Sequence, residues 1–192
     1  HGYELAKDGF GFPGRGLAIK PGGSATLKIK RQNIAERLYR ITGEGIYCDS
    51  VLLGQRPPIE QPLLNAKVTG SDSTMNVIYR GRLHWFWGDT NWPAYPLGLF
   101  HMAGAVSKLP ADGGLDPAAG VNLDYYRGEN GFARGMAQMP GDGPTWINGV
   151  AVVPNSDGNE QMLCGYAKIK PPLEVYGRGL ALWYDKAERF EL

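Results

Sequence analysis

The chain alternates apolar and polar residues in short runs that are separated by turn residues. Four stretches carry this pattern: 41–53, 75–90, 145–170 and 178–192. Alternation with a period of two places the apolar side chains on one face of a strand, whereas the longer period of an amphipathic helix is weak throughout. Only residues 34–39 are compatible with a helical turn or two. The pattern therefore predicts an all-β chain.

Two of these stretches share one order of parts. Each begins with an apolar strand, turns at Arg80-Gly81 or at 155–159, and continues in a second strand rich in aromatic residues. The segment between them, 93–140, is rich in Gly and Pro, and so long a connection either is functional or contains further short strands. We expect one strand within 98–110 and an edge strand within 121–136. The shared order indicates a repeat.

Residues 1–38 differ from the rest of the chain. Two alternating runs, 17–20 and 25–30, flank Pro21-Gly22-Gly23, which is typical of a β-hairpin with one wet face. Because an isolated hairpin is marginal in water, we interpret 1–38 as the last strands of a β-sandwich domain and 39–192 as a second domain. The chain begins with His1 rather than Met, so we expect it to be a piece of a longer protein, with a removed leader as the alternative.

Charge and cysteine content narrow the possible partners. The 20 basic and 19 acidic residues form no block of like charge, which argues against nucleic acid and membrane surfaces as partners. No run approaches the roughly 18 apolar residues of a membrane span. Cys48 and Cys164 are too few for a disulfide framework, and the sequence leaves open whether they pair.

The stretch SDSTMNVIYRGRLHWFWGDT, residues 71–90, resembles a first blade of the five-bladed β-propeller glycoside hydrolases. It has an Asp near the inner strand, an apolar strand, a turn at Gly and an aromatic strand that ends in Gly. The end of the chain, RGLALWYDKAERFEL, resembles the outer part of a later blade, and the segment before Arg40 is similar to the end of a carboxypeptidase-regulatory-like sandwich domain. The resemblance covers about residues 40–192.

This resemblance implies a partial propeller behind a sandwich remnant. We expect about two to three of the five blades within 39–192, and the rest of the ring outside this chain, because an open ring exposes a blade face. The resemblance also implies a secreted or periplasmic protein whose partner is a carbohydrate. The implied reaction is hydrolysis of a glycosidic bond.

Three aspartates are candidate catalytic residues, because glycoside hydrolysis usually needs two carboxyl groups beside the scissile bond. Asp72 matches the first-blade acid, which by resemblance is the general base. Asp89 lies in a Gly-Asp-Thr turn after an aromatic strand, where an apolar face would raise its pKa if it excludes water. Asp49 lies in the strand expected at 41–53. Asp72 and Asp89 each have a structural alternative, because Asp in a turn often binds backbone N–H groups.

The general acid has no clear match in the chain. The resemblance implies a Glu from a later blade, which we expect beyond Leu192. Where members of the family often carry a second-blade Asp, this chain has Gly-Pro-Thr-Trp-Ile at 143–147.

Aromatic and basic residues are the candidates for substrate binding, because flat apolar rings suit sugar faces. The candidates are Trp85, Trp87, Trp92, Trp146, His84, His101 and Arg178, with Lys168 as a further hydroxyl binder. The tryptophans can equally fill space between blades, and a lone His is usually structural. No spacing resembles a zinc site and no motif indicates a cofactor. Three functions remain open: a glycoside hydrolase, a non-catalytic glycan-binding or scaffold propeller, or a propeller used for protein contacts, for which Trp85, Trp87 and Trp92 would lie on an exposed patch. The oligomeric state is left open.

Overall fold

The computed structural model describes residues 3–14, 16–32, 41–43, 45 and 47–192. The chain divides into two compact units, 1–39 and 40–192, which are described separately. The helical turn predicted at 34–39 lies outside the described residues.

The described part of the first unit contains one pair of short strands. β1 (Tyr3–Leu5) pairs antiparallel with β2 (Ile29–Arg31). The predicted turn is present, since the Gly23 N–H donates to the Lys20 carbonyl at 2.8 Å. The runs on either side of it do not pair with each other, however, so the predicted hairpin is wrong. Alternation specifies a strand partner only where one face is buried, and the side chains of 17–20 are exposed.

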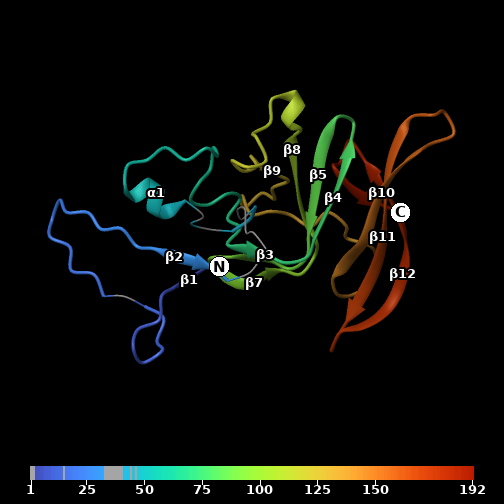
Figure 1. The fold of residues 1–192 in the computed structure, drawn as a ribbon. Coiled ribbons are helices and arrows are strands. Elements are labelled where there is room, and N and C mark those ends of the chain that lie inside the picture. The colour runs from blue at the N-terminus through green and yellow to red at the C-terminus, as the bar shows by residue number, and fades with distance from the viewer. Residues whose placement is uncertain (1–2, 15, 33–40, 44, 46) are drawn as a thin grey trace. The chain divides into compact units, whose positions relative to one another are not determined.

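The described part of the second unit contains three antiparallel sheets and almost no helix (Figure 1). One sheet has the order β4 (Thr74–Tyr79), β5 (Arg82–Trp87), β8 (Ala103–Lys108) and β9 (Asp124–Tyr125). Another has the order β10 (Thr145–Pro154), β11 (Glu160–Lys170), β12 (Glu174–Tyr184) and β13 (Arg189–Glu191). A smaller sheet joins β3 (Gly70–Ser71), β6 (Thr90–Trp92) and β7 (Tyr95–Leu99). The prediction of an all-β chain is confirmed.

The strands predicted within 98–110 and 121–136 are β8 and the edge strand β9. The strand predicted at 41–53 is wrong, because this stretch contains the short helix α1 (Cys48–Leu52). None of the residues of α1 is buried, so no packed sheet face selects a strand there. A single 3₁₀ turn, η1 (Pro110–Asp112), follows β8.

Local turn chemistry fixes the two long hairpins. Arg80 and Gly81 both have positive φ, at 50° and 71°, as the tightest hairpin turns require. At the β10–β11 turn, the Asn155 side-chain oxygen accepts the N–H groups of Asp157 and Asn159 at 3.0 and 2.9 Å. Both predicted turns are confirmed.

The sheet β4-β5-β8-β9 is a middle layer, because both of its faces are covered. On one face, Phe86 belongs to a core cluster with Met162 and Trp183 of the β10–β13 sheet. On the other face, Trp85 and Trp87 belong to a second cluster. It includes residues that precede β4 in the chain, such as Val68, and residues that follow β9, such as Phe132. Figure 1 shows the green strands of this layer beside the orange and red strands of the β10–β13 sheet. Alternate side chains of β5 therefore pack into two different hydrophobic clusters, one on each face of the sheet.

Both cysteines are free. Cys48 is half-buried at the start of α1, and Cys164 is buried in the core cluster between the two four-stranded sheets. Burial raises the pKa of the Cys164 thiol to about 12, so this residue is a packing group rather than a nucleophile.

Candidate active site

The structure brings Asp72 and Asp89 together at the open end of the β4–β5 hairpin. Asp72 precedes β4 and Asp89 follows β5. The Asp72 N–H donates to the Asp89 carbonyl at 3.2 Å, and the Gly88 N–H donates to the Asp72 carbonyl at 2.9 Å. Strand pairing thus places two of the three predicted carboxyl residues next to each other.

Gly88 gives the Asp72 side chain its room. A Cβ atom at Gly88 would collide with the Asp72 carboxylate oxygen Oδ1, and it would lie 3.3 Å from the Ser73 Cβ. The Asp72 carboxyl therefore lies across the backbone of Gly88. Only glycine at this position permits the arrangement, because any other residue carries the atom that fills the space.

The two carboxyl groups have different surroundings. Asp72 is exposed, whereas Asp89 is half-buried. Burial raises the pKa of the Asp89 carboxyl above its ordinary value, and the nearby negative charge of Asp72 raises it further. A carboxyl that keeps its proton to higher pH beside a solvated carboxylate is the combination that acid–base hydrolysis uses.

Strand β6, which follows Asp89, carries two unpaired polar groups. The Asn91 Oδ1 and the Trp92 Nε1 are buried and have no hydrogen-bond partner among the described residues. Buried polar atoms are nearly always paired, so an unpaired acceptor and donor on neighbouring residues need an explanation. The Trp92 ring stacks on Phe132 with 4.9 Å between centroids. Sequence reasoning selected Trp92 for its ring but gave no reason to select Asn91.

Trp85 and Trp87 are interior residues. They are 7% and 1% exposed, and their rings are parallel within 3° with centroids 6.2 Å apart. The Trp85 indole N–H donates to the Ser107 hydroxyl at 2.9 Å, which satisfies its polar atom inside the core. The structure places both rings in the packing position that the sequence had left as an alternative to sugar binding.

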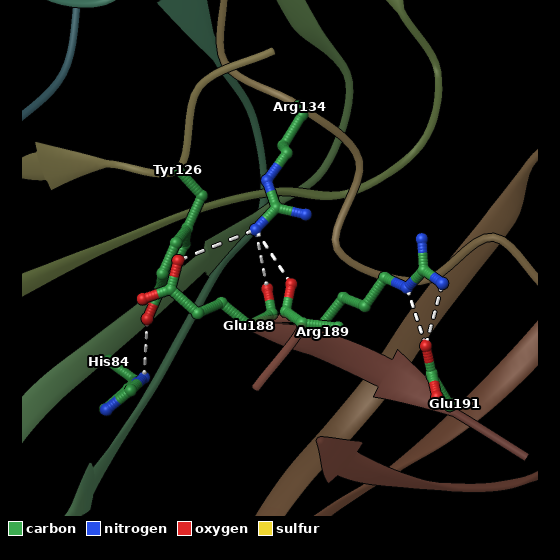
Figure 2. A network of polar contacts seen from close by, with 7 residues as sticks. His84, Tyr126, Arg134, Glu188, Arg189 and Glu191 are labelled. Atoms are coloured by element: carbon green, nitrogen blue, oxygen red, sulfur yellow. Dashed lines mark hydrogen bonds and ion pairs between the residues drawn. The ribbon is translucent and has the colours of Figure 1, made fainter. Parts of the chain in front are cut away.

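His84 is a core residue on the opposite face of β5. Figure 2 shows the Tyr126 hydroxyl reaching its ring, at 3.3 Å from Nδ1. Edge-on contacts with Tyr79 and Trp183 complete its surroundings. Burial, followed by the positive charge of Arg82, lowers the pKa of His84 to about 4. The ring is therefore neutral near pH 7.

His101 and Lys168 lie near the start of β10. The His101 Nδ1 accepts the Thr145 N–H at 3.1 Å, and burial lowers its pKa. The Lys168 ammonium is buried and donates to the carbonyls of Met139 and Gly143 at 3.1 and 2.7 Å. Each side chain thus holds backbone in place.

The remaining predicted site residues lie on other elements. Asp49 is exposed in the first turn of α1, Arg178 is exposed on β12, and the half-buried Trp146 donates its indole N–H to the Phe100 carbonyl at 3.1 Å. None of the contacts between described residues joins these side chains to Asp72 or Asp89.

Among the described residues, no group of three or more His, Cys, Asp or Glu side chains has the arrangement of a metal site. Within the same part of the chain, no helix has the length and apolarity to cross a membrane. Comparisons of the chain with known protein families, with curated proteins and with solved structures find no match.

Proposed function

We propose that this chain belongs to a carbohydrate-active protein of the glycoside hydrolase-like propeller kind, acting on a polysaccharide or oligosaccharide. The observation that carries the proposal is the pairing of Asp72 and Asp89 at one strand end, with the pKa of Asp89 raised. Hydrolysis of a glycosidic bond needs two carboxyl groups in unlike protonation states, and no cofactor.

The two carboxyl groups take different roles in this proposal. Asp72 is exposed and acts as the base that activates water. Asp89 retains its proton to higher pH, which suits it to donate a hydrogen bond to a substrate oxygen and to position the substrate. In this proposal the proton for the leaving-group oxygen comes from the Glu of a later blade that the resemblance implies. Gly88 leaves room for the Asp72 carboxyl against the end of the hairpin, on the same strand end as Asp89.

The sheet order supports the propeller part of the proposal. Both four-stranded sheets are antiparallel and follow the order of their strands in the chain, and their faces share one core. Propeller blades are four-stranded sheets that pack face to face around a centre. A secreted or periplasmic location fits a protein that acts on polysaccharides.

The alternative function is glycan binding without catalysis. The observation that favours it is the half-buried Trp92 close after Asp89 in the chain. An aromatic ring beside a carboxyl group can bind a sugar without any chemical step.

The test is release of reducing sugar from a panel of polysaccharides by the full reading frame. We expect Asp72→Asn and Asp89→Asn each to reduce release by roughly 10²–10⁴-fold, the contribution of a positioned acid or base. Asp157→Asn is the matched control, because Asp157 is an exposed turn residue on another hairpin and should leave release unchanged.

Two outcomes would redirect the proposal. No release, with glycan binding that is lost in Trp92→Ala, would favour the binding function. Neither release nor binding with any glycan of the panel would contradict both functions.

A further inference from the structure

The two candidate aspartates lie at a junction between two sheets. The β4–β5 ladder ends where Thr74 is opposite Trp87, and the β3–β6 ladder begins where Ser71 is opposite Thr90. Each of the two strands has a pair of residues between these ladders, and one residue of each pair is a candidate aspartate. The place of each carboxyl group therefore depends on how this junction is held.

Backbone hydrogen bonds hold the junction less regularly than they hold a strand ladder. The Gly88 N–H is shared between the Asp72 carbonyl at 2.9 Å and the Ser73 carbonyl at 3.0 Å. Ser73 has a positive φ of 36°, which is uncommon for a residue other than glycine. Such a conformation persists only where the surrounding structure holds it in place. The junction therefore needs further bonds, and side chains supply them.

The Thr90 hydroxyl supplies one of these bonds from inside the protein. Thr90 is 0% exposed, and its Oγ1 donates to the Gly88 carbonyl at 3.0 Å. The Ser71 hydroxyl lies 3.2 Å from the same Oγ1. A carbonyl can only accept and a hydroxyl has one proton, so Thr90 gives its proton to Gly88, and Ser71 donates to Thr90. The two hydroxyls thus form a directed chain of hydrogen bonds that joins the two strands.

These bonds set the backbone on both sides of Asp89. Gly88 and Thr90 are its neighbours in the chain, and Ser71 is the residue before Asp72. The Asp89 carboxyl is half-buried, and burial is the main cause of its raised pKa. A shift of this backbone toward solvent would return the pKa toward its ordinary value. The pKa of Asp89 therefore reports whether the junction keeps its place.

We propose that Thr90 is the positioning residue of the Asp72–Asp89 pair, and that Ser71 orients the Thr90 hydroxyl. Neither hydroxyl contacts the substrate in this proposal, because each acts through the backbone beside the aspartates. The consequence for hydrolysis rests on the proposed function, whereas the positioning of Asp89 does not.

The test is an NMR titration of the carboxyl groups in the ¹³C-labelled chain. Thr90→Val keeps the shape of the side chain but removes the hydroxyl, so we expect a lower pKa of Asp89 than in the parent. Thr90→Ser retains the hydroxyl and should restore the pKa toward that of the parent. Thr145→Val is the matched control, because Thr145 is equally buried and its hydroxyl accepts the Met139 N–H on another sheet. It should leave the pKa of Asp89 unchanged.

Ser71→Ala tests the same chain of bonds from its other end, and it keeps the buried Thr90 side chain if Thr90→Val does not fold. It should also lower the pKa of Asp89, because the Thr90 hydroxyl loses the donor that orients it. The proposal is overturned if this pKa is unchanged in Ser71→Ala or in folded Thr90→Val, if Thr90→Ser behaves as Thr90→Val does, or if Thr145→Val lowers the pKa equally.

Release of reducing sugar by the full reading frame separates this proposal from the proposed function. Thr90→Val should reduce release by up to about 10²-fold, the cost of a displaced group at a reacting centre. No release by the parent would contradict hydrolysis, and the titration of Asp89 would then decide the positioning alone. Release by the parent that is unchanged in Thr90→Val, together with an unchanged pKa of Asp89, would overturn the positioning and leave the proposed function standing.

Discussion

Acidification is expected to destabilise the 40–192 unit through one buried histidine. His84 is 7% exposed, and burial and Arg82 lower its pKa from 6.5 to about 4, against a smaller opposing effect of Asp185. Between these two values the unfolded chain binds a proton at His84 while the folded chain does not. Its neutral form therefore contributes stability that is fully present above pH 6.5 and is lost as the pH falls toward 4.

The magnitude follows from the pKa difference. At about 1.36 kcal/mol for each pH unit, the free energy of unfolding should fall by about 3 kcal/mol between pH 6.5 and pH 4. This is a large share of the roughly 5–15 kcal/mol that stabilises an ordinary domain. The loss should therefore be visible as a marked decrease in the urea midpoint.

Urea unfolding, followed by tryptophan fluorescence from pH 7 to pH 4, measures this effect in the parent and in His84→Gln. The variant loses packing but has no imidazole to protonate. The difference in free energy of unfolding between the parent and the variant should therefore shrink by about 3 kcal/mol from pH 7 to pH 4. Val106→Ala is the control, because Val106 lies directly opposite His84 in the sheet and its truncation should cost the same at every pH. A difference in free energy of unfolding between the parent and His84→Gln that is equal at pH 7 and pH 4 would refute the reasoning.

Three further predictions concern the candidate site and the buried lysine. Asp89→Asn should unfold at a higher urea midpoint than the parent at pH 7, and the difference between the two midpoints should close toward pH 3.8. The reason is that the raised pKa of Asp89 makes the parent lose stability as the pH rises through that pKa, whereas the variant does not ionise; a lower midpoint for the variant at pH 7 would contradict this. Gly88→Ala should change the melting temperature little, because the exposed Asp72 carboxyl can move aside, but it should reduce hydrolysis by displacing that carboxyl; unchanged hydrolysis would contradict the role of Asp72. Lys168→Met should cost roughly 2–4 kcal/mol in urea unfolding, since it leaves carbonyls of the 139–143 segment unpaired, and a neutral result would show that the ammonium does not hold that segment.

The adjacency of the two candidate aspartates was accessible from the sequence. A two-residue turn at Arg80-Gly81 fixes the register of both strands, and Asp72 and Asp89 lie at equal distances from that turn. The ladder of paired residues, in which Tyr79 is opposite Arg82 and Thr74 is opposite Trp87, follows from this local rule. The unpaired Asn91 and Trp92 atoms do not follow from it, because they depend on what packs over β6.

The failed predictions have a common cause. The runs at 17–20 and 41–53 alternate as strands do, but pairing depends on a covered face, and none of the described residues of either run is buried. The same limit applies to contacts between distant loops, such as the bond from the Glu60 N–H to the Asn122 Oδ1. No spacing in the sequence predicts a contact between segments so far apart in the chain.

The sequence by itself determined the all-β class, the two hairpin turns and the register that brings Asp72 to Asp89, because turn geometry and strand alternation act between neighbours in the chain. Only the tertiary structure decided that Trp85 and Trp87 are interior, that His84 is a neutral core residue, and that Tyr125 packs on Trp87. Burial depends on which distant segment covers each face of a sheet, and that choice belongs to the packing of the whole unit.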